Sequence, residues 1–340
     1  MTSATQEKAA AAAAAKANLK FPLNYVPAAT RPYLELIRLE KVVSSSMIDS
    51  TDHRSQPTGT WLMFWPGAWG LTMAAYHSQP SYQQYAISLG QALVGAFLLR
   101  SSACTINDIF DKNMDAGVER TKGRPLPSGR ISVLAATIYL LLQYAAGVAF
   151  FYATMREEAF QVSVFQLIPL FAVYPLLKRV TYWPQAWLGL AMNFGFIPSW
   201  LALSSSNSTV FWAAMAGCWC WTMLYDTIYA CQDIKGDLKV GVRSTAILFG
   251  SWIRVLLVGC GLGFVSMLAV AGVANEQGLP YFAVAVGGTA LHLLWQAATV
   301  DLNVPKSCWT NFNRNGQLGW IVWGGMMLDY VVAKKLVELR

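Results

Sequence analysis

Charged residues are scarce in this sequence, at 13% of its 340 residues. Soluble globular domains carry about 25% charged residues, whereas this chain combines the shortage with 55% hydrophobic residues and a mean hydropathy of +0.38. The composition therefore argues against a soluble domain and predicts an integral membrane protein that contacts the lipid bilayer. The net charge of +7 is modest for this length, so the sequence predicts no nucleic-acid partner.

Targeting signals and metal-binding cysteine patterns are also missing. The six cysteines fall mostly in or beside apolar segments and show no metal-ligand spacing, so we interpret them as packing residues. No leucine-rich apolar region precedes a cleavage-like site, and the first arginine is Arg31, with Glu7 before it. The N-terminal sequence therefore predicts neither a secretory signal peptide nor a convincing mitochondrial transit peptide.

The chain divides into a polar N-terminal region, residues 1–56, and an apolar region, residues 57–340. Residues 31–41 predict a short amphipathic helix, which either lies on the membrane surface or packs on the domain as a solvated helix. Residues 42–56 break this pattern and resemble an inserted loop.

Apolar segments of membrane-crossing length follow from Thr58 onward. A spanning helix needs about 20 apolar residues, and in lipid its backbone must satisfy its own hydrogen bonds. The sequence therefore predicts an all-α polytopic membrane protein, a bundle of about nine transmembrane helices. We place them near 58–77, 83–106, 131–153, 160–177, 184–204, 209–230, 246–273, 280–300 and 316–334.

Basic residues gather in the loops that follow the second, fourth, sixth and eighth spans. The positive-inside rule would place these loops in the cytosol or its topological equivalent. A bound anion would also require cations there, and the sequence leaves both causes open. The sequon that begins at Asn207 lies on the opposite face, in a loop too short to favour glycosylation.

Two clusters of aspartates stand out at the ends of apolar segments. Asp108, Asp111 and Asp115 are spaced i, i+3 and i+7, which is one face of a helix. Far along the chain a second set has the spacing i, i+3, i+7 and i+11, again one helical face, and consists of Asp226, Tyr229, Asp233 and Asp237. The chain crosses the membrane four times between the clusters, so both are predicted on the same face, around one cavity.

Stacked carboxylates repel one another unless a cation joins them. Mg²⁺ suits such a site because it binds a few carboxylates and completes its shell with substrate phosphate and water. The clusters therefore predict a Mg²⁺–diphosphate site built by two helices. A solvated helix cap explains a single acidic face equally well, but it explains two facing clusters beside basic loops poorly.

The two motifs resemble the signatures of the UbiA family of intramembrane prenyltransferases. The first is NDIFDKNMD at residues 107–115, and the second is DTIYACQDIKGD at residues 226–237. Three further segments are similar to family stretches: RTKGRPL at 120–126, YPLLKR at 174–179 and GVRST at 241–245. The resemblance runs from about Arg31 to the C-terminus. It departs from the family at residues 42–56, which separate an Arg-x-x-Lys stretch from a Pro-x-Gly-Thr stretch.

The resemblance implies a role for each motif residue. Metal ligands would be Asp108, Asp111, Asp115, Asp226, Asp233 and Asp237. Diphosphate oxygens would be held by Lys122, Arg124 and Arg243. The catalytic set would comprise Asn107, Tyr174, Lys178, Arg179, Asn193 and Tyr229. Without the resemblance, Lys178 and Arg179 are equally well explained as topology determinants, and Tyr174 and Asn193 as packing residues.

The implied activity is Mg²⁺-dependent transfer of a prenyl group, with farnesyl diphosphate as donor, to a ring carbon of an aromatic acceptor. The sequence is most similar to the 4-hydroxybenzoate polyprenyltransferase branch, which includes fungal enzymes that prenylate orsellinic-acid-type polyketides for meroterpenoids. Cys231 stands where ubiquinone enzymes usually have histidine, which favours the polyketide acceptor and the endoplasmic reticulum. The alternative is 4-hydroxybenzoate prenylation for ubiquinone in the mitochondrial inner membrane.

Intramembrane acids also mark ion paths, so a transporter or channel is the rival from another class. Here the acids gather at helix ends beside basic loops, and no inverted repeat is evident. A non-catalytic membrane scaffold would need no such clusters and is the least favoured interpretation.

Overall fold

The computed structural model describes residues 23–39, 58–119, 121–203 and 208–338. The predicted insertion at 42–56 and the sequon residue Asn207 lie outside these ranges, so both remain predictions, as does the division at residue 57. Within the described ranges every regular element is a helix and there is no strand. The all-α prediction is therefore confirmed.

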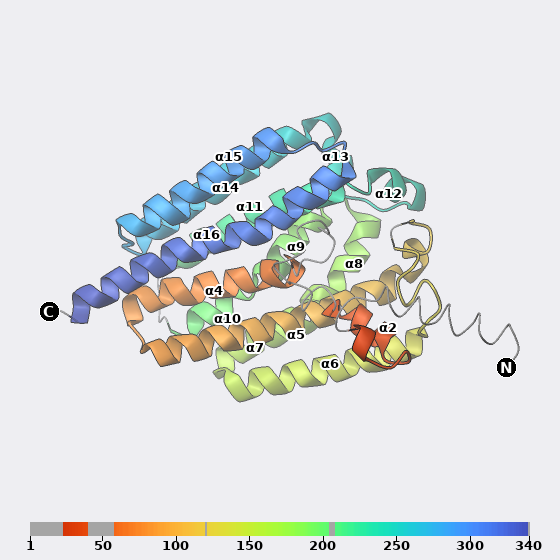
Figure 1. The fold of residues 1–340 in the computed structure, drawn as a ribbon, viewed down its shortest axis with the longest axis horizontal. Helices are drawn as coiled ribbons and strands as arrows, with labels where there is room; N and C mark the ends of the chain where they lie inside the picture. The colour runs from red at the N-terminus through yellow and green to blue at the C-terminus, as the bar shows by residue number, and fades with distance from the viewer. Residues whose placement is uncertain (1–22, 40–57, 120, 204–207, 339–340) are drawn as a thin grey trace, which may run out of the picture.

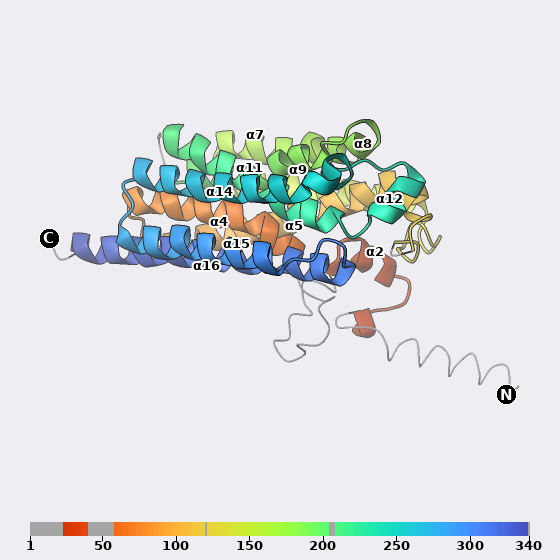
Figure 2. The ribbon, with the colours of Figure 1, turned by 90° about the horizontal axis from the view of Figure 1, so that it is seen from above.

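Six long helices run side by side along the long axis of the molecule (Figures 1 and 2). They are α4 (Thr58–Ser78), α5 (Tyr82–Asp115), α6 (Val133–Thr154), α11 (Ser208–Ala230), α14 (Ile253–Ala274) and α16 (Pro305–Glu338). Helix α4 is the central one, since each of its residues from Leu62 to Ala75 is buried. Its neighbours on the outside of the bundle present apolar side chains outward, as lipid contact requires.

Shorter helices complete the bundle. Several segments that the sequence predicted as one continuous span consist of two or more consecutive shorter helices. The span 160–177 consists of α7 (Glu157–Phe165), the π-helical turn η3 (Gln166–Leu170) and α8 (Phe171–Val180). Pro169 lies inside η3 and lacks the N–H that a regular helix needs. The span 184–204 divides into α9 (Pro184–Asn193) and α10 (Phe196–Leu201).

The last part of the chain contains two more composite spans and a small surface helix. The first composite span joins α13 (Thr245–Phe249) and η4 (Gly250–Trp252) to α14, and the second joins η5 (Tyr281–Gly287) to α15 (Gly288–Thr299). The surface helix α12 (Ile234–Val240) lies between α11 and α13. Each of the nine predicted spans thus corresponds to a helix or to a run of consecutive helices in the described part of the chain.

Among the described residues, five segments are long and apolar enough to cross a membrane by length and composition: 82–115, 133–154, 157–180, 245–274 and 281–299. The other predicted spans are α4, the α9–α10 pair, α11 and α16, which run alongside these five in the bundle. The molecule is therefore an integral membrane protein.

Hydrogen bonds and close packing join the first and last long helices, α4 and α16. The indole N–H of Trp65 on α4 donates to the carbonyl of Gly316 on α16 at 2.8 Å, and that of Trp69 donates to Gly319 at 3.4 Å. A Cβ atom at Gly319 would overlap the Trp65 ring, so glycine is required for this approach. Near the start of both helices, Thr58 donates to the Asn313 side chain at 2.6 Å. These contacts join the central helix α4 to the last helix, α16.

The N-terminal helix α2 (Arg31–Leu36) packs on the end of the bundle. Leu36 is fully buried in a small core with Leu126 and Ile131, and Arg130 makes two hydrogen bonds to the Glu35 carboxylate, at 2.7 and 2.8 Å. The helix therefore packs on the domain, and its position at the membrane surface remains a prediction. This docking carries Arg38, which has a φ of 60°, to the end of α5.

Candidate active site

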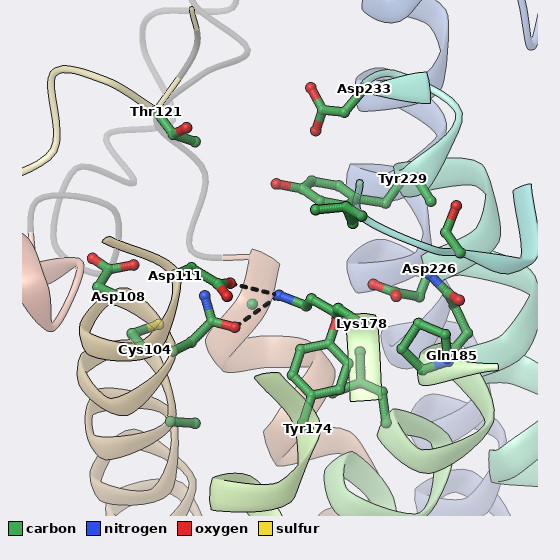
Figure 3. A pocket seen from close by; sticks show the side chains of 18 of the residues that line it. Cys104, Asp108, Asp111, Thr121, Tyr174, Lys178, Gln185, Asp226, Tyr229 and Asp233 are labelled. Carbon is green, nitrogen blue, oxygen red and sulfur yellow. Dashed lines mark hydrogen bonds and ion pairs between the residues drawn. The ribbon is translucent and has the colours of Figure 1, made fainter. Parts of the chain in front are cut away.

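A cavity of about 290 Å³ opens at the end of the bundle where α2, α8 and α12 lie. Its walls come from α4, α5, α8, α9, α11, α12 and α16. All six aspartates predicted as metal ligands line it: Asp108, Asp111, Asp115, Asp226, Asp233 and Asp237. The two clusters face each other across this space, as their placement on one membrane face predicted (Figure 3).

The first cluster lies on the last two turns of α5, which continues beyond the apolar stretch as one 34-residue helix. Asp108 is fully buried and bound by Arg38, whose Nη2 lies 2.8 and 2.9 Å from its two oxygens. Arg124 joins the cluster from the following loop, at 3.1 Å from Asp108 and 2.8 Å from Asp115. These arginines hold an otherwise repulsive row of carboxylates together.

The second cluster is not on one continuous helix as predicted. Helix α11 ends at Ala230, and Asp233 becomes the N-cap of α12, on which Asp237 lies. The helix breaks where the sequence turns polar, so Asp233 and Asp237 are held by a separate short helix. Gly241, with a φ of 76°, ends α12 and returns the chain so that the Arg243 amide donates to the Lys178 carbonyl at 2.8 Å.

Asp226 lies deeper than Asp233 and is buried on α11. The side chain of Gln185 on α9 hydrogen-bonds to it, and the positive charges of Lys178 and Arg100 act on it electrostatically. Gln185 also accepts a hydrogen bond from the Thr245 amide at 3.0 Å, which fixes its orientation. Asp226 is thus a positioned carboxylate on the inner wall of the cavity.

Lys178 on α8 reaches the first cluster on α5. Its ammonium group donates to Asn107 at 2.8 Å and to Asp111 at 3.1 Å (Figure 3). The same group lies 4.5 Å from the centre of the Tyr174 ring, one turn earlier on α8. Tyr229 lies on the opposite wall, where its ring packs 4.8 Å from that of Phe312. The structure therefore brings Asn107, Tyr174, Lys178 and Tyr229 to the cavity, as predicted.

The predicted basic residues divide into two groups. Arg124 and Arg243 line the cavity, and Arg243 also donates to the Val180 carbonyl at 2.8 Å. Lys122 is exposed and pairs with Glu119 at 2.7 Å, and it is not a lining residue. Arg179 is also outside the lining. It donates to the Phe110 carbonyl and lies 3.7 Å from Asp111, so it contacts the first cluster from outside the cavity.

Asn193 is the predicted site residue that lies farthest from this chemistry. It is fully buried, does not line the cavity, and donates to Gly189, Cys218 and Thr222 between α9 and α11. Thr222 in turn donates to the hydroxyl of Tyr225, a cavity residue, at 3.1 Å. Hydrogen bonds through Thr222 thus link Asn193 to the cavity residue Tyr225.

Sequence reasoning missed three residues that line the cavity: Arg38, Arg100 and Gln185. Arg100 had a usable signal, because it is a charge inside an apolar stretch, seven residues before Asn107 and on the same helical face. Its guanidinium group lies against Gly59, where a Cβ atom would be 2.5 Å from Nη2. Gln185 had no signal, since one glutamine at the start of a span has no distinctive spacing.

The cavity's donor set suits a magnesium ion. Six carboxylates line one space, and the Oδ1 atom of Asp111 is buried without a hydrogen-bond donor. Among the described residues no three acidic, histidine or cysteine side chains are grouped as a ready metal site. That arrangement fits Mg²⁺, which is commonly bound by one or two carboxylates together with substrate phosphates.

Below the charged rim the cavity becomes apolar. Leu62, Phe171, Leu188 and Met192 form its inner walls, from the three helices α4, α8 and α9. An amphiphile with an anionic head and an apolar tail matches this division, with the head among the arginines and lysine and the tail in the bundle.

Comparison with known proteins identifies the family. A model of the UbiA prenyltransferase family matches residues 63–321. The chain is 41% identical to the UbiA prenyltransferase claS of Ampulloclitocybe clavipes, covering 89% of this chain and 92% of that protein. It is 38% identical to the mitochondrial 4-hydroxybenzoate polyprenyltransferase of Caenorhabditis elegans, covering 91% of this chain and 84% of that protein.

Solved structures share the fold. The UbiA homolog from Aeropyrum pernix K1 superposes with a TM-score of 0.66 at 24% identity, over 79% of this chain and 97% of that one. The UbiA homolog from Archaeoglobus fulgidus bound to GPP and Mg²⁺ has a TM-score of 0.63 at 19% identity, over 88% of this chain and 99% of that one.

Proposed function

Because the chain belongs to the UbiA prenyltransferase family and is an aromatic prenyltransferase of the membrane, we propose that it transfers a farnesyl group from farnesyl diphosphate to a ring carbon of an orsellinic-acid-type phenol. This reaction would serve meroterpenoid secondary metabolism. The observation that best supports the proposal is that six aspartates and several cationic side chains line one cavity with an apolar interior. Because the chain belongs to a family of prenyltransferases, we no longer favour the transporter and scaffold interpretations.

The charged rim is the binding site for the diphosphate. Lys178, Arg124 and Arg243 present donors to it, and charge-assisted hydrogen bonds to phosphate oxygens are short and strong. The facing carboxylates of the α5 and α11–α12 clusters would hold Mg²⁺. When bound, Mg²⁺ supplies Lewis-acid neutralisation of the leaving diphosphate. The Archaeoglobus homolog bound to GPP and Mg²⁺ supports this assignment.

The chain's own residues then control the allylic carbon. As the carbon–oxygen bond breaks, negative charge grows on the diphosphate, where the Lys178 ammonium group is already positioned by Asn107. Positive charge grows on the allylic carbon, and Tyr174 and Tyr229, which line the cavity, supply aromatic rings of the kind that stabilise a cation. The buried inner walls exclude water, which would otherwise capture the cation. The phenol attacks through a ring carbon, and loss of the ring proton restores aromaticity.

Arg100 supports an acceptor that is itself an acid. Its guanidinium group lines the cavity beside the first turn of α4, away from the pairs that hold the α5 aspartates. A planar guanidinium binds a carboxylate through two parallel hydrogen bonds. Orsellinic-type acids and 4-hydroxybenzoate both carry such a group, so Arg100 favours an acidic acceptor without choosing between them.

The second candidate is prenylation of 4-hydroxybenzoate for ubiquinone, in the mitochondrial inner membrane. The similarity to named mitochondrial 4-hydroxybenzoate polyprenyltransferases favours it. The similarity to the fungal relative claS, at 41% identity, favours the secondary-metabolism proposal. Acceptor preference separates the two.

The test uses microsomes that contain the full chain. Farnesyl diphosphate and Mg²⁺ are supplied with orsellinic acid and with 4-hydroxybenzoate in parallel, and products are read by mass spectrometry. We expect farnesylated orsellinic acid, lost on chelation with EDTA and restored by added Mg²⁺. The variants Asp108→Ala and Asp233→Ala should abolish it.

Each alternative result has a distinct meaning. Product from 4-hydroxybenzoate alone would assign the protein to ubiquinone synthesis. Product that persists in Asp108→Ala would contradict the assignment of the cavity as the reaction site. Absence of any prenylated product from folded protein, across donors of three to nine isoprenoid units, would overturn the proposed donor and acceptor classes together.

A further inference from the structure

A chain of buried hydrogen bonds runs from α9 to the wall of the cavity and ends at Tyr225 on α11. It begins at Asn193, whose Nδ2 atom lies 2.6 Å from the Gly189 carbonyl and 2.7 Å from the Thr222 hydroxyl. The Thr222 hydroxyl in turn donates to the Tyr225 hydroxyl at 3.1 Å. Asn193 and Thr222 are fully buried and do not line the cavity, whereas Tyr225 does. The chain therefore connects the interior of the bundle to the active site.

The direction of each hydrogen bond in this chain is fixed. An amide nitrogen can only donate, and the Asn193 nitrogen also lies 3.1 Å from the Cys218 carbonyl. Turning the amide over would place its oxygen against two carbonyl oxygens, which cannot donate to it. The Thr222 oxygen therefore accepts from Asn193, and its one proton goes to the Tyr225 oxygen. Tyr225 keeps its own proton, which it does not share with Thr222.

The side chain that carries this proton is held firmly. The ring of Trp221 packs edge-on against that of Tyr225 at 5.0 Å between ring centres, and the ring of Phe312 does so at 5.9 Å. In the part of the chain that the structure describes, no group accepts the Tyr225 proton. Tyr225 thus has a fixed hydroxyl with an unused donor, at the wall of the cavity.

Two charged groups lie near this hydroxyl. The charges of Asp226 and Arg100 both act on it electrostatically, and Arg100 acts in the same way on Asp226. Arg100 belongs to α5 and Tyr225 to α11, the two helices whose aspartate clusters face each other across the cavity (Figure 3). One wall therefore offers a guanidinium group and the other a hydroxyl donor.

A flat acid with a hydroxyl opposite its carboxylate matches these two groups. Arg100 is proposed to bind the carboxylate through two parallel hydrogen bonds. The hydroxyl at the far end of the ring then lies toward α11 and Tyr225. Orsellinic acid and 4-hydroxybenzoate both carry a hydroxyl at this para position. A buried donor that faces a ligand hydroxyl discriminates against analogues without it, because the donor is then left unpaired.

We infer that the Tyr225 hydroxyl donates a hydrogen bond to the para hydroxyl of the aromatic acceptor, and that Asn193 and Thr222 are positioning residues for this donor. The contact orients the ring between α5 and α11, and so selects the ring carbon that meets the allylic carbon. Tyr225 is thus a specificity-determining residue. This inference rests on the proposed function, because it assigns one wall of the same site to the acceptor.

The experiment compares acids with and without the para hydroxyl. Orsellinic acid is paired with 2-hydroxy-6-methylbenzoic acid, and 4-hydroxybenzoate with benzoate. Binding to the purified full chain is measured by calorimetry with Mg²⁺ and inorganic diphosphate present. Tyr225→Phe removes the donor and keeps the ring. Tyr281→Phe is the matched control, since Tyr281 is equally buried and donates to the Leu268 carbonyl at 2.8 Å but does not line the cavity.

We expect wild-type protein to bind the acid with the para hydroxyl about three- to tenfold more tightly in at least one pair, the effect of one buried hydrogen bond. Tyr225→Phe should bring that ratio close to unity and should yield products prenylated at more than one ring carbon. Tyr281→Phe should keep the wild-type ratio. Thr222→Val, which removes the donor to Tyr225, should lower the ratio, and Thr222→Ser, which keeps a hydroxyl, should retain it.

Binding and turnover keep the two hypotheses separate. Equal binding within both pairs in wild-type protein, or the same ratio in Tyr225→Phe and Tyr281→Phe, would overturn the inference while prenyl transfer stands. If Tyr225→Phe does not fold, the wild-type ratio and the comparison of Thr222→Val with Thr222→Ser decide, because a merely structural role of Thr222 would change thermal stability and leave the ratio unchanged.

The remaining outcomes concern the proposed function as well. Binding that depends on the para hydroxyl, without transfer to any phenol, would overturn the proposed function and leave the Tyr225 contact intact. Absence of binding by all of these acids to folded protein would overturn both.

Discussion

Lys178 shows what a motif can and cannot predict about a single residue. The spacing of the first motif correctly placed Asp108, Asp111 and Asp115 along one helix, whereas the second motif is divided between α11 and α12. The spacing did not separate Arg124, which holds two of the first motif's aspartates, from Lys122, which points to solvent. Both lie in a loop of turns, where the direction of a side chain depends on contacts far along the chain. For Lys178 itself, the sequence left a catalytic and a topological role equally open, and the contacts to Asn107 and Asp111 favour the first.

Replacing Lys178 with methionine should remove most of the activity. The change deletes the cation nearest the leaving diphosphate and leaves Asp111 without its hydrogen-bonded partner. Loss of one positioned electrostatic group costs about 10²–10³ in kcat, and we expect a fall of that size in steady-state assays. Arg179→Gln is the neighbouring control, with an effect below about tenfold, since Arg179 does not line the cavity. Similar losses in both variants would contradict the role assigned to Lys178.

At the scale of elements, hydropathy predicted where the helices are but not where they break. Each predicted span is helical, yet α9 ends at Asn193 and α10 begins at Phe196, and η3 is a π-helical turn. Hydropathy averages over about twenty residues, so a break of two or three residues inside an apolar run leaves no trace in it. The break after Ala230 was missed for a different reason, since the aspartate spacing of the second motif continues with helical period through it.

The contact between α4 and α16 gives a prediction about stability. Gly319→Ala would push a methyl group into the Trp65 ring, and such overpacking costs about 1–3 kcal/mol. Gly324→Ala on the same helix is the matched control, because its Cβ would meet no atom within 4 Å. We expect a lower midpoint of thermal unfolding in detergent for Gly319→Ala alone. Equal midpoints for the two variants would show that this contact does not limit stability.

For the whole molecule, counting spans was enough to bring the two clusters together. Four crossings between them return the chain to the same face, and the structure places both clusters on one cavity. The count could not predict the contribution of α2, because Arg38 reaches Asp108 through docking on a loop 90 residues later.

Orientation in the membrane can be tested with single cysteines. The basic end of the molecule, which carries the active site, should face the cytosol or its equivalent. An impermeant maleimide added from that side should label cysteines introduced at Ser128 and Leu238, which are exposed there. Those at Ser81 and Glu158 should label from the opposite side. The native cysteines are buried or half-buried, so their background should be low. Labelling of all four positions from one side would contradict the predicted crossings.

The hydrogen-bonded contact between α4 and α16 also has a consequence for biosynthesis. Trp65 and its partner Gly316 are 251 residues apart in the chain. A ribosome that adds about 5–20 residues per second needs roughly 13 to 50 s between them. Throughout that interval the nascent α4 stands in the membrane with its indole donors unpaired and one wall of the cavity missing. The catalytic chamber is therefore assembled only when the final helix is inserted, and a transcript truncated before α16 yields an open bundle.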